Sequence, residues 1–121
     1  MRLRYARITT AGPVREINED YLDFWESEDP LVREQKGSVA LLADGVGGLD
    51  CGEVASRMAV EEALQVFRDI PAGADPAETL RRMFTIACTK VHDAALAAMS
   101  GRSLAKRSYH SAASALTAMA W

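Results

Sequence analysis

The stretch Ser38-Val-Ala-Leu-Leu-Ala-Asp44-Gly45-Val-Gly-Gly-Leu-Asp-Cys-Gly52 joins an apolar run to a glycine-rich loop, and it decides the fold. Residues 38–43 are apolar on both faces, the pattern expected of a central strand that is covered on both sides. This strand ends abruptly at Asp44 and Gly45. Beyond the glycines, apolar residues recur at helical spacing and predict a helix over about 53–67. They are Val54, Ala55, Met58, Ala59, Ala63, Leu64 and Phe67.

The flanking segments predict further strands and one more helix. Residues 3–8 alternate imperfectly, as in a short strand with a bulge or an edge position, and residues 21–25 form a second strand. A helix is predicted from Asp75, its N-cap, to a stop near Gly101. Residues 113–121 are alanine-rich, which favours helix, but interrupting Ser and Thr residues favour a buried strand.

Composition limits the class of protein. The 121 residues are 49% hydrophobic and 26% charged, which suits one globular domain over residues 1–121. A formal charge of −3 predicts neither a nucleic-acid nor a membrane partner. Two cysteines without metal-ligand spacing, and no apolar run of signal or membrane length, predict a cytoplasmic location. All 17 acidic residues lie at or before Asp93, so residues 94–121 carry only basic charge.

Two segments carry chemistry. Three carboxylates, those of Glu19, Asp20 and Asp44, are predicted on loops together with the guanidinium of Arg15. Carboxylate oxygens and backbone carbonyls are preferred ligands of Mg²⁺ and Mn²⁺, and arginine matches a phosphate with two parallel hydrogen bonds. A glycine at position 45 allows a backbone carbonyl to approach a metal. The pattern indicates a site for a hard cation and a phosphate.

Two nucleotide-binding motifs are excluded at the glycine-rich loop. A P-loop needs a lysine after its second glycine, whereas Gly52 is followed by Glu53 and Val54. A dinucleotide-binding loop needs a third glycine at the position of Asp50. The loop therefore matches neither motif.

The order of three motifs resembles the metal-dependent type-2C (PPM) serine/threonine protein phosphatases, in particular the bacterial branch. The first motif is Gly12 with Arg15-x-x-Asn18-Glu19-Asp20. The second is Ala43-Asp44-Gly45-Val46-Gly47-Gly48, and the third is Gly52-Glu53-Val54-Ala55-Ser56. Three motifs in this order are far more specific than any one of them.

The resemblance implies the role of each site residue. Asp44 would bridge two Mg²⁺ or Mn²⁺ ions, the Gly45 carbonyl would join one of them, and Glu19 and Asp20 would ligate directly or through water. Arg15 would bind the substrate phosphate, which makes Arg15 and Asp44 the predicted catalytic pair. A two-metal site activates water for attack on phosphorus, so no covalent phospho-enzyme is needed.

The resemblance also implies a fold and a function. The fold is α+β, the N-terminal half of a four-layer α-β-β-α sandwich in which helices flank two antiparallel sheets. The function is hydrolysis of phosphoserine and phosphothreonine in a phosphorylated protein, by a truncated or partial domain. Two alternatives stay open, namely a catalytically silent phosphoprotein-binding or regulatory module, and a half-domain completed by a C-terminal half, another chain or a second copy.

Three departures from the family pattern bear on activity. The histidines that many relatives have at the positions of Val46 and Leu49 are absent, so leaving-group protonation would fall to water or another group. Residues 109–113 lack the glycines of the usual Gly-x-Gly-Thr-Thr. The family's second half supplies further metal-binding aspartates, and residues 94–121 have none, so the predicted metal site is incomplete.

Glu53 and Ser56 are interpreted as helix-start residues.

Overall fold

The computed structural model describes residues 3–45, 52–100 and 115–120 of the chain. Predictions for the glycine-rich loop beyond Gly45 and for the basic stretch before the last strand fall outside the described residues. The elements, in chain order, are β1 (Tyr21–Glu26), α1 (Pro30–Lys36), β2 (Ser38–Asp44), α2 (Gly52–Asp69), α3 (Pro76–Ser100) and β3 (Ala115–Ala120).

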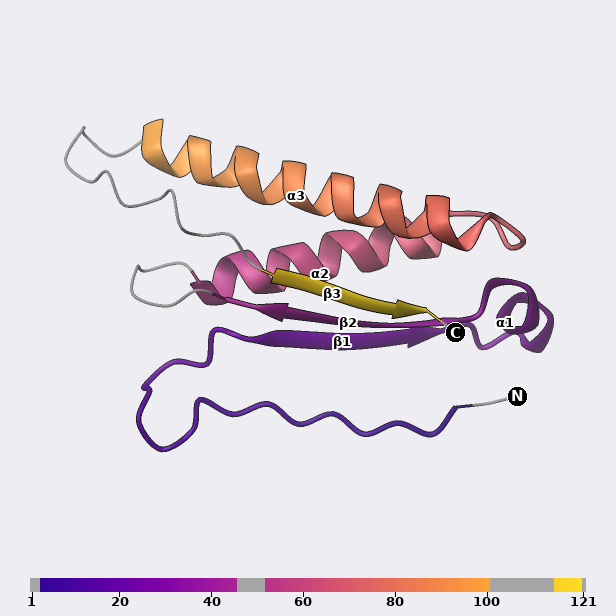
Figure 1. Cartoon of the computed structure of the whole chain (residues 1–121), viewed down its shortest axis with the longest axis horizontal. Helices are drawn as coiled ribbons and strands as arrows, with labels where there is room; N and C mark the ends of the chain where they lie inside the picture. The colour runs from indigo at the N-terminus through magenta and orange to yellow at the C-terminus, as the bar shows by residue number, and fades with distance from the viewer. Residues whose placement is uncertain (1–2, 46–51, 101–114, 121) are drawn as a thin grey trace.

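The strands form one antiparallel sheet in the order β1-β2-β3 (Figure 1). β2 is its central strand, as its apolar sequence predicted. β1 pairs with β2 from Tyr21↔Ala43 to Glu26↔Ser38, and β2 pairs with β3 from Val39↔Ala120 to Asp44↔Ala115. The α+β class, both strands of the β1–β2 pair and the strand near the C-terminus are confirmed.

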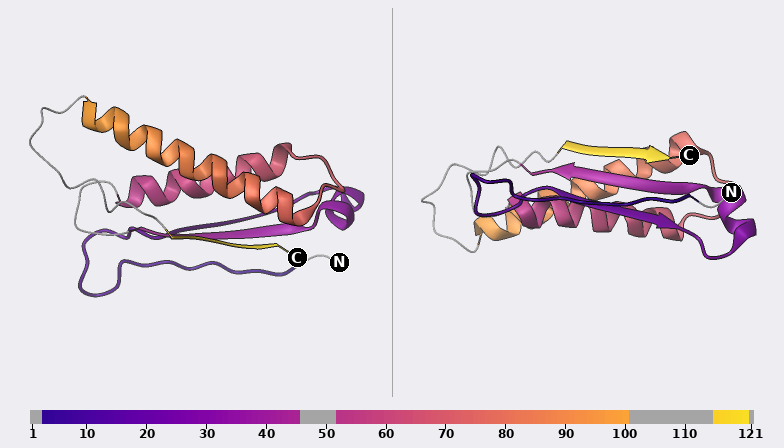
Figure 2. Two further views of the ribbon diagram at one scale, coloured as in Figure 1. Left: turned by 45° about the horizontal axis from the view of Figure 1, so that its top comes forward. Right: turned by 90° about the horizontal axis from the view of Figure 1, so that it is seen from below.

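Helices α2 and α3 lie together on one face of the sheet (Figures 1 and 2). Their lengths are close to the predicted ones, and Asp75 caps α3, its Oδ2 accepting the backbone N–H of Glu78 at 2.8 Å. The core between these layers combines alternate residues of β2 with one stripe from each helix. Its buried members are Val39, Leu41, Ala43, Ala59, Val60, Ala63, Leu64, Phe67, Met83 and Ala87. Within the described residues, no helix has the length and apolar content needed to cross a bilayer.

The other face of the sheet carries the N-terminal segment rather than helices (Figure 2). The strand predicted over residues 3–8 is wrong. This segment runs irregularly, because a strand needs a partner for its backbone hydrogen bonds and no described strand pairs with it. Side chains attach it instead. The Tyr5 ring lies 3.8 Å from the Phe24 ring between centroids, and Arg7 forms an ion pair with Asp23.

The same face remains partly open, so the expected burial of β2 on both sides is only half correct. Val39, Leu41 and Ala43 are buried against the helices. Leu42, between the last two of them, points the opposite way and keeps 44% of its surface exposed. Asp44 follows on that open face and is also exposed.

Helix α1, in the connection between β1 and β2, was not predicted. Asp29 is its N-cap and accepts the N–H of Leu31 at 2.8 Å, and Gly37 ends it with a φ of 76°. Lys36 in its last turn places its ammonium 5.4 Å from the ring centroids of Trp25 and Phe67. The helix thus lies at the end of the sheet opposite Asp44, the last residue of β2 (Figure 1).

Candidate functional site

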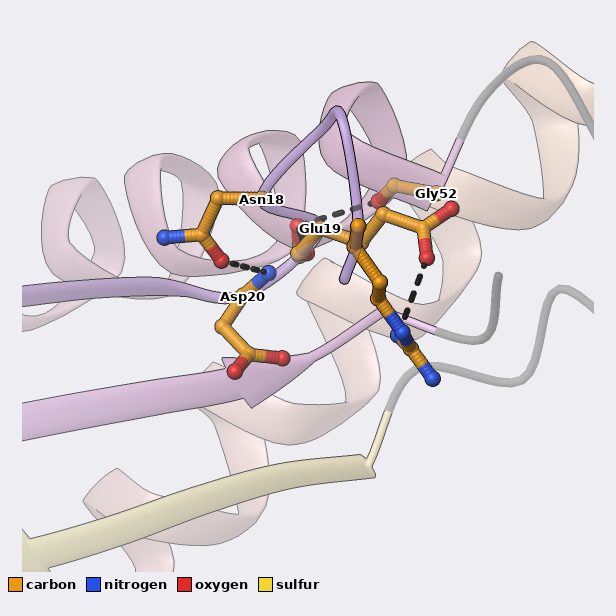
Figure 3. A network of polar contacts seen from close by, with 6 residues as sticks. Asn18, Glu19, Asp20 and Gly52 are labelled. Carbon is orange, nitrogen blue, oxygen red and sulfur yellow. Dashed lines mark hydrogen bonds and ion pairs between the residues drawn. The ribbon is translucent and has the colours of Figure 1, made fainter. Parts of the chain in front are cut away.

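Glu19 and Asp20 lie at one end of the sheet, where the loop before β1 meets the start of α2 at Gly52 (Figure 3). Asp44, the last residue of β2, lies at the same end. Arg15 and Glu19 form an ion pair, with Nη1 and Oε2 3.4 Å apart. The Glu19 side chain is only 12% exposed, whereas that of Arg15 is 67% exposed. Glu19 therefore holds one edge of the guanidinium, and the rest of it faces solvent, where a phosphate is able to bind.

Asn18 shapes the backbone that leads into β1. Its Oδ1 accepts the backbone N–H of Asp20 at 3.1 Å, and its Nδ2 donates to the Thr9 hydroxyl at 2.7 Å. A side-chain amide that bonds two residues ahead makes a local turn without regular structure. This turn directs the carboxylates of Glu19 and Asp20 in different directions (Figure 3).

Asp20 and Asp44 flank the last pair of the β1–β2 ladder. Tyr21 pairs with Ala43, so the residue before Tyr21 and the residue after Ala43 lie next to each other across two strand ends. Both aspartates are exposed, and among the described residues neither carboxylate has an ion-pair partner. Two like charges side by side on a sheet repel each other unless a cation lies between them.

Gly45 and Gly52 pack against the backbone and side chain of Glu19. A Cβ on Gly45 would lie 2.4 Å from the Glu19 carbonyl oxygen and 2.9 Å from that of Gly52. A Cβ on Gly52 would lie 2.7 Å from Glu19 Oε1. Only glycine fits at position 45, where both obstacles are backbone carbonyls, whereas a Cβ at position 52 would meet the Glu19 side chain. Glu19 sits against the first turn of α2, where a negative charge is favourable.

These residues suit a hard divalent cation. Asp20 and Asp44 are exposed residues at adjacent strand ends, and Gly45 directly follows Asp44, so every potential donor, including the Gly45 carbonyl, is an oxygen. Within the described residues, however, the structure assembles no group of three or more acidic, histidine or cysteine side chains around one point. Of the three predicted carboxylates, that of Glu19 lies apart from the other two, since it faces Arg15 and Gly52.

A family model, protein phosphatase 2C, matches residues 15–120. The chain belongs to this family. The match begins at Arg15 and includes both carboxylate-bearing segments and every helix and strand described above. No curated protein and no solved structure matched the chain. Membership of the protein phosphatase 2C family relates the chain to serine/threonine phosphatases.

One functional candidate was missed in the sequence. Ser56, interpreted only as a helix-start residue, is fully buried, and its hydroxyl donates to the Glu19 carbonyl. The signal that could have found it is the spacing of small residues along α2. Gly52, Ser56 and Ala63 follow the buried stripe, whereas the larger Val54 is 40% exposed.

Proposed function

We propose that this protein phosphatase 2C chain acts in the metal-dependent hydrolysis of phosphoserine and phosphothreonine in proteins. The observation that carries the proposal is the pair of carboxylates of Asp20 and Asp44, which lie at adjacent strand ends and have no ion-pair partner among the described residues, in a chain of this family. With the exposed guanidinium of Arg15 near by, the site offers ligands for cations and for a phosphate.

Each residue has a separate task in this proposal. Asp44 and Asp20, with the Gly45 carbonyl, would hold the cations, and Arg15 would orient the substrate phosphate through the part of its guanidinium that Glu19 does not contact. Two Mg²⁺ or Mn²⁺ ions, when bound, would supply the Lewis acidity that activates water and the positive charge that neutralises the phosphate oxygens. Glu19 contacts Arg15 and directly precedes Asp20. It therefore couples the position of the guanidinium that would bind the phosphate to the position of Asp20.

The proposed fold of the complete site is a four-layer sandwich, of which the described sheet and its helices are one half. The exposed side of Leu42 supports a second sheet on the open face, as does the N-terminal segment, which pairs with no strand that the structure describes. That sheet would come from a C-terminal half or from another chain, and it would bring the remaining metal ligands.

Hydrolysis of a phosphothreonine peptide in the presence of Mn²⁺ tests the proposal. Asp44→Asn is expected to lower the rate by at least about a hundredfold, since it removes a carboxylate that would hold the cations. Asp93→Asn, which removes an equivalent carboxylate from the exposed side of α3, is the matched control and keeps the wild-type rate.

The outcomes separate the candidate functions. Equal rates for wild type and Asp44→Asn would refute the assignment of Asp44. If neither the wild type nor a variant hydrolyses the peptide, calorimetry measures the binding of Mn²⁺ and of the peptide to the wild-type chain. A silent phosphoprotein-binding module binds both, and a chain that has lost the site binds neither. Size-exclusion mass then shows whether a second copy completes the half-domain.

A further inference from the structure

Ser56 connects two segments that are far apart in the sequence. It lies in the second turn of α2 with 0% of its surface exposed. Its hydroxyl donates to the backbone carbonyl of Glu19, 37 residues away, and also lies 3.0 Å from the Gly52 carbonyl and 3.3 Å from that of Glu53. A serine in a helix commonly satisfies its hydroxyl with the carbonyl four residues earlier. Here the shortest contact leaves the helix and reaches the loop before β1.

The carbonyl that Ser56 binds belongs to the peptide group between Glu19 and Asp20. The N–H of that same peptide group donates to Asn18 Oδ1 at 3.1 Å. Both polar ends of one peptide plane are therefore held, one by α2 and one by the turn. Fixing this plane fixes the Cα of Asp20, and with it the direction in which the carboxylate leaves the backbone.

The packing around this peptide allows little movement. Gly45 approaches the Glu19 carbonyl so closely that a Cβ would collide with it at 2.4 Å. Gly45 directly follows Asp44, so the contact joins the end of β2 to the same peptide plane that Ser56 holds. One backbone group, the Glu19–Asp20 peptide, thus contacts both α2 and the residue that follows Asp44.

We infer that Ser56 is a positioning residue for the cation site, which acts through the Glu19–Asp20 peptide and contacts neither metal nor substrate. The inference rests on the proposed function, because it concerns the same site. Groups that orient metal ligands from behind change metal affinity about 10–100-fold when they are removed. Ser56 would orient Asp20 by binding the backbone carbonyl of Glu19, and not by binding a side chain that holds the metal.

The test compares Ser56→Ala with Ser38→Ala in the full chain. Ser38 is also buried, at 4% exposure, but its hydroxyl lies at the opposite end of β2, 3.4 Å from Glu26 Oε2. By calorimetry, Ser56→Ala is expected to bind Mn²⁺ about tenfold more weakly than wild type. Ser38→Ala is expected to bind it with unchanged affinity, and Ser56→Thr, which restores the hydroxyl, to recover most of the loss.

A second measurement needs no metal. Hydrogen exchange of the Asp20 backbone amide, followed by NMR, is expected to be about tenfold faster in Ser56→Ala than in Ser38→Ala, because the peptide is released at its carbonyl end. Equal amide exchange in the two alanine variants, or equal Mn²⁺ affinity, would overturn the inference. If the wild-type chain binds no Mn²⁺, the proposed function fails, and the exchange rates alone decide the role of Ser56.

Discussion

Gly45→Ala is the sharpest perturbation of the junction between β2 and the loop before β1. The added Cβ would lie 2.4 Å from the Glu19 carbonyl oxygen, whereas ordinary contact begins at 3.4 Å, so one of the two backbones must move by about 1 Å. The second obstacle, the Gly52 carbonyl at 2.9 Å, is also backbone. No side chain can rotate away to relieve the collision.

The expected cost follows from this geometry. Forcing one extra carbon into a packed site typically destabilises a protein by 1–3 kcal/mol, and two backbone obstacles place Gly45→Ala at about 2 kcal/mol or more. Gly45 does not have a left-handed φ, so the cost comes from space alone. The displacement also separates Asp44 from Asp20, and Mn²⁺ affinity is expected to fall about tenfold or more.

Urea denaturation and Mn²⁺ calorimetry measure the two effects. Gly73→Ala is the control, since Gly73 has a φ of 82° but open space around the position of its Cβ. It is expected to cost about 1 kcal/mol through backbone strain and to leave Mn²⁺ binding unchanged. An unfolding free energy for Gly45→Ala within about 0.5 kcal/mol of wild type would show that the added Cβ meets no collision, because surface substitutions alone produce changes of that size.

Three further predictions concern the scaffold. Met83→Ala, at a fully buried core position, is expected to lower the unfolding free energy in urea by about 2–5 kcal/mol, whereas Cys88→Ala on the exposed side of the same helix changes it by less than about 0.5 kcal/mol. Asp29→Ala removes the N-cap of α1 and should cost about 1 kcal/mol in the same assay, and no change would argue against the cap. Burial lowers the pKa of Lys36 below its ordinary 10.5, and the charge of Asp69 opposes this shift. Between the lowered pKa and 10.5 the unfolded chain binds more protons than the folded one, so the free energy of unfolding should rise with pH over that range. Lys36→Met should abolish this rise in pH-dependent denaturation, and identical slopes would contradict it.

Much of the scaffold was predictable because its signals are local. The two-sided apolar run of β2 and the helical periodicity of α2 and α3 reflect burial directly, and all three elements lie near the predicted residues. Helix α1 left no such signal, since it has seven residues and none is buried. Its only signature is Asp29 before Pro30, an N-cap followed by proline at the first helical position.

The N-terminal segment shows the opposite error. Residues 3–8 have strand-like alternation, but pairing depends on a partner that no local pattern reveals. In the described structure, the Tyr5–Phe24 ring contact and the Arg7–Asp23 ion pair take the place of a hydrogen-bond ladder. The alternation therefore shows that residues 3–8 are able to form a strand, but it does not predict whether they pair with the described sheet.

The site was predictable as a set of residues but not as an arrangement. Motif order identified Asp20 and Asp44, which the register then brought together across two strand ends. Sequence order could not show that Glu19, adjacent to Asp20, turns its carboxylate towards Arg15 and α2. Nor could it separate the hydroxyl of Ser56 from an ordinary helix-start serine, because the bond it makes spans 37 residues.

The two faces of the sheet have different consequences for function. The helix-covered face is closed by the core, whereas the open face carries Leu42 and, two residues further along β2, Asp44. Side chains two residues apart on a strand project from the same face, so an element that covers Leu42 also comes within reach of Asp44. Burial of the apolar surface and completion of the proposed cation site would then be one event, since the second sheet that shields Leu42 would bring its ligands to the same edge.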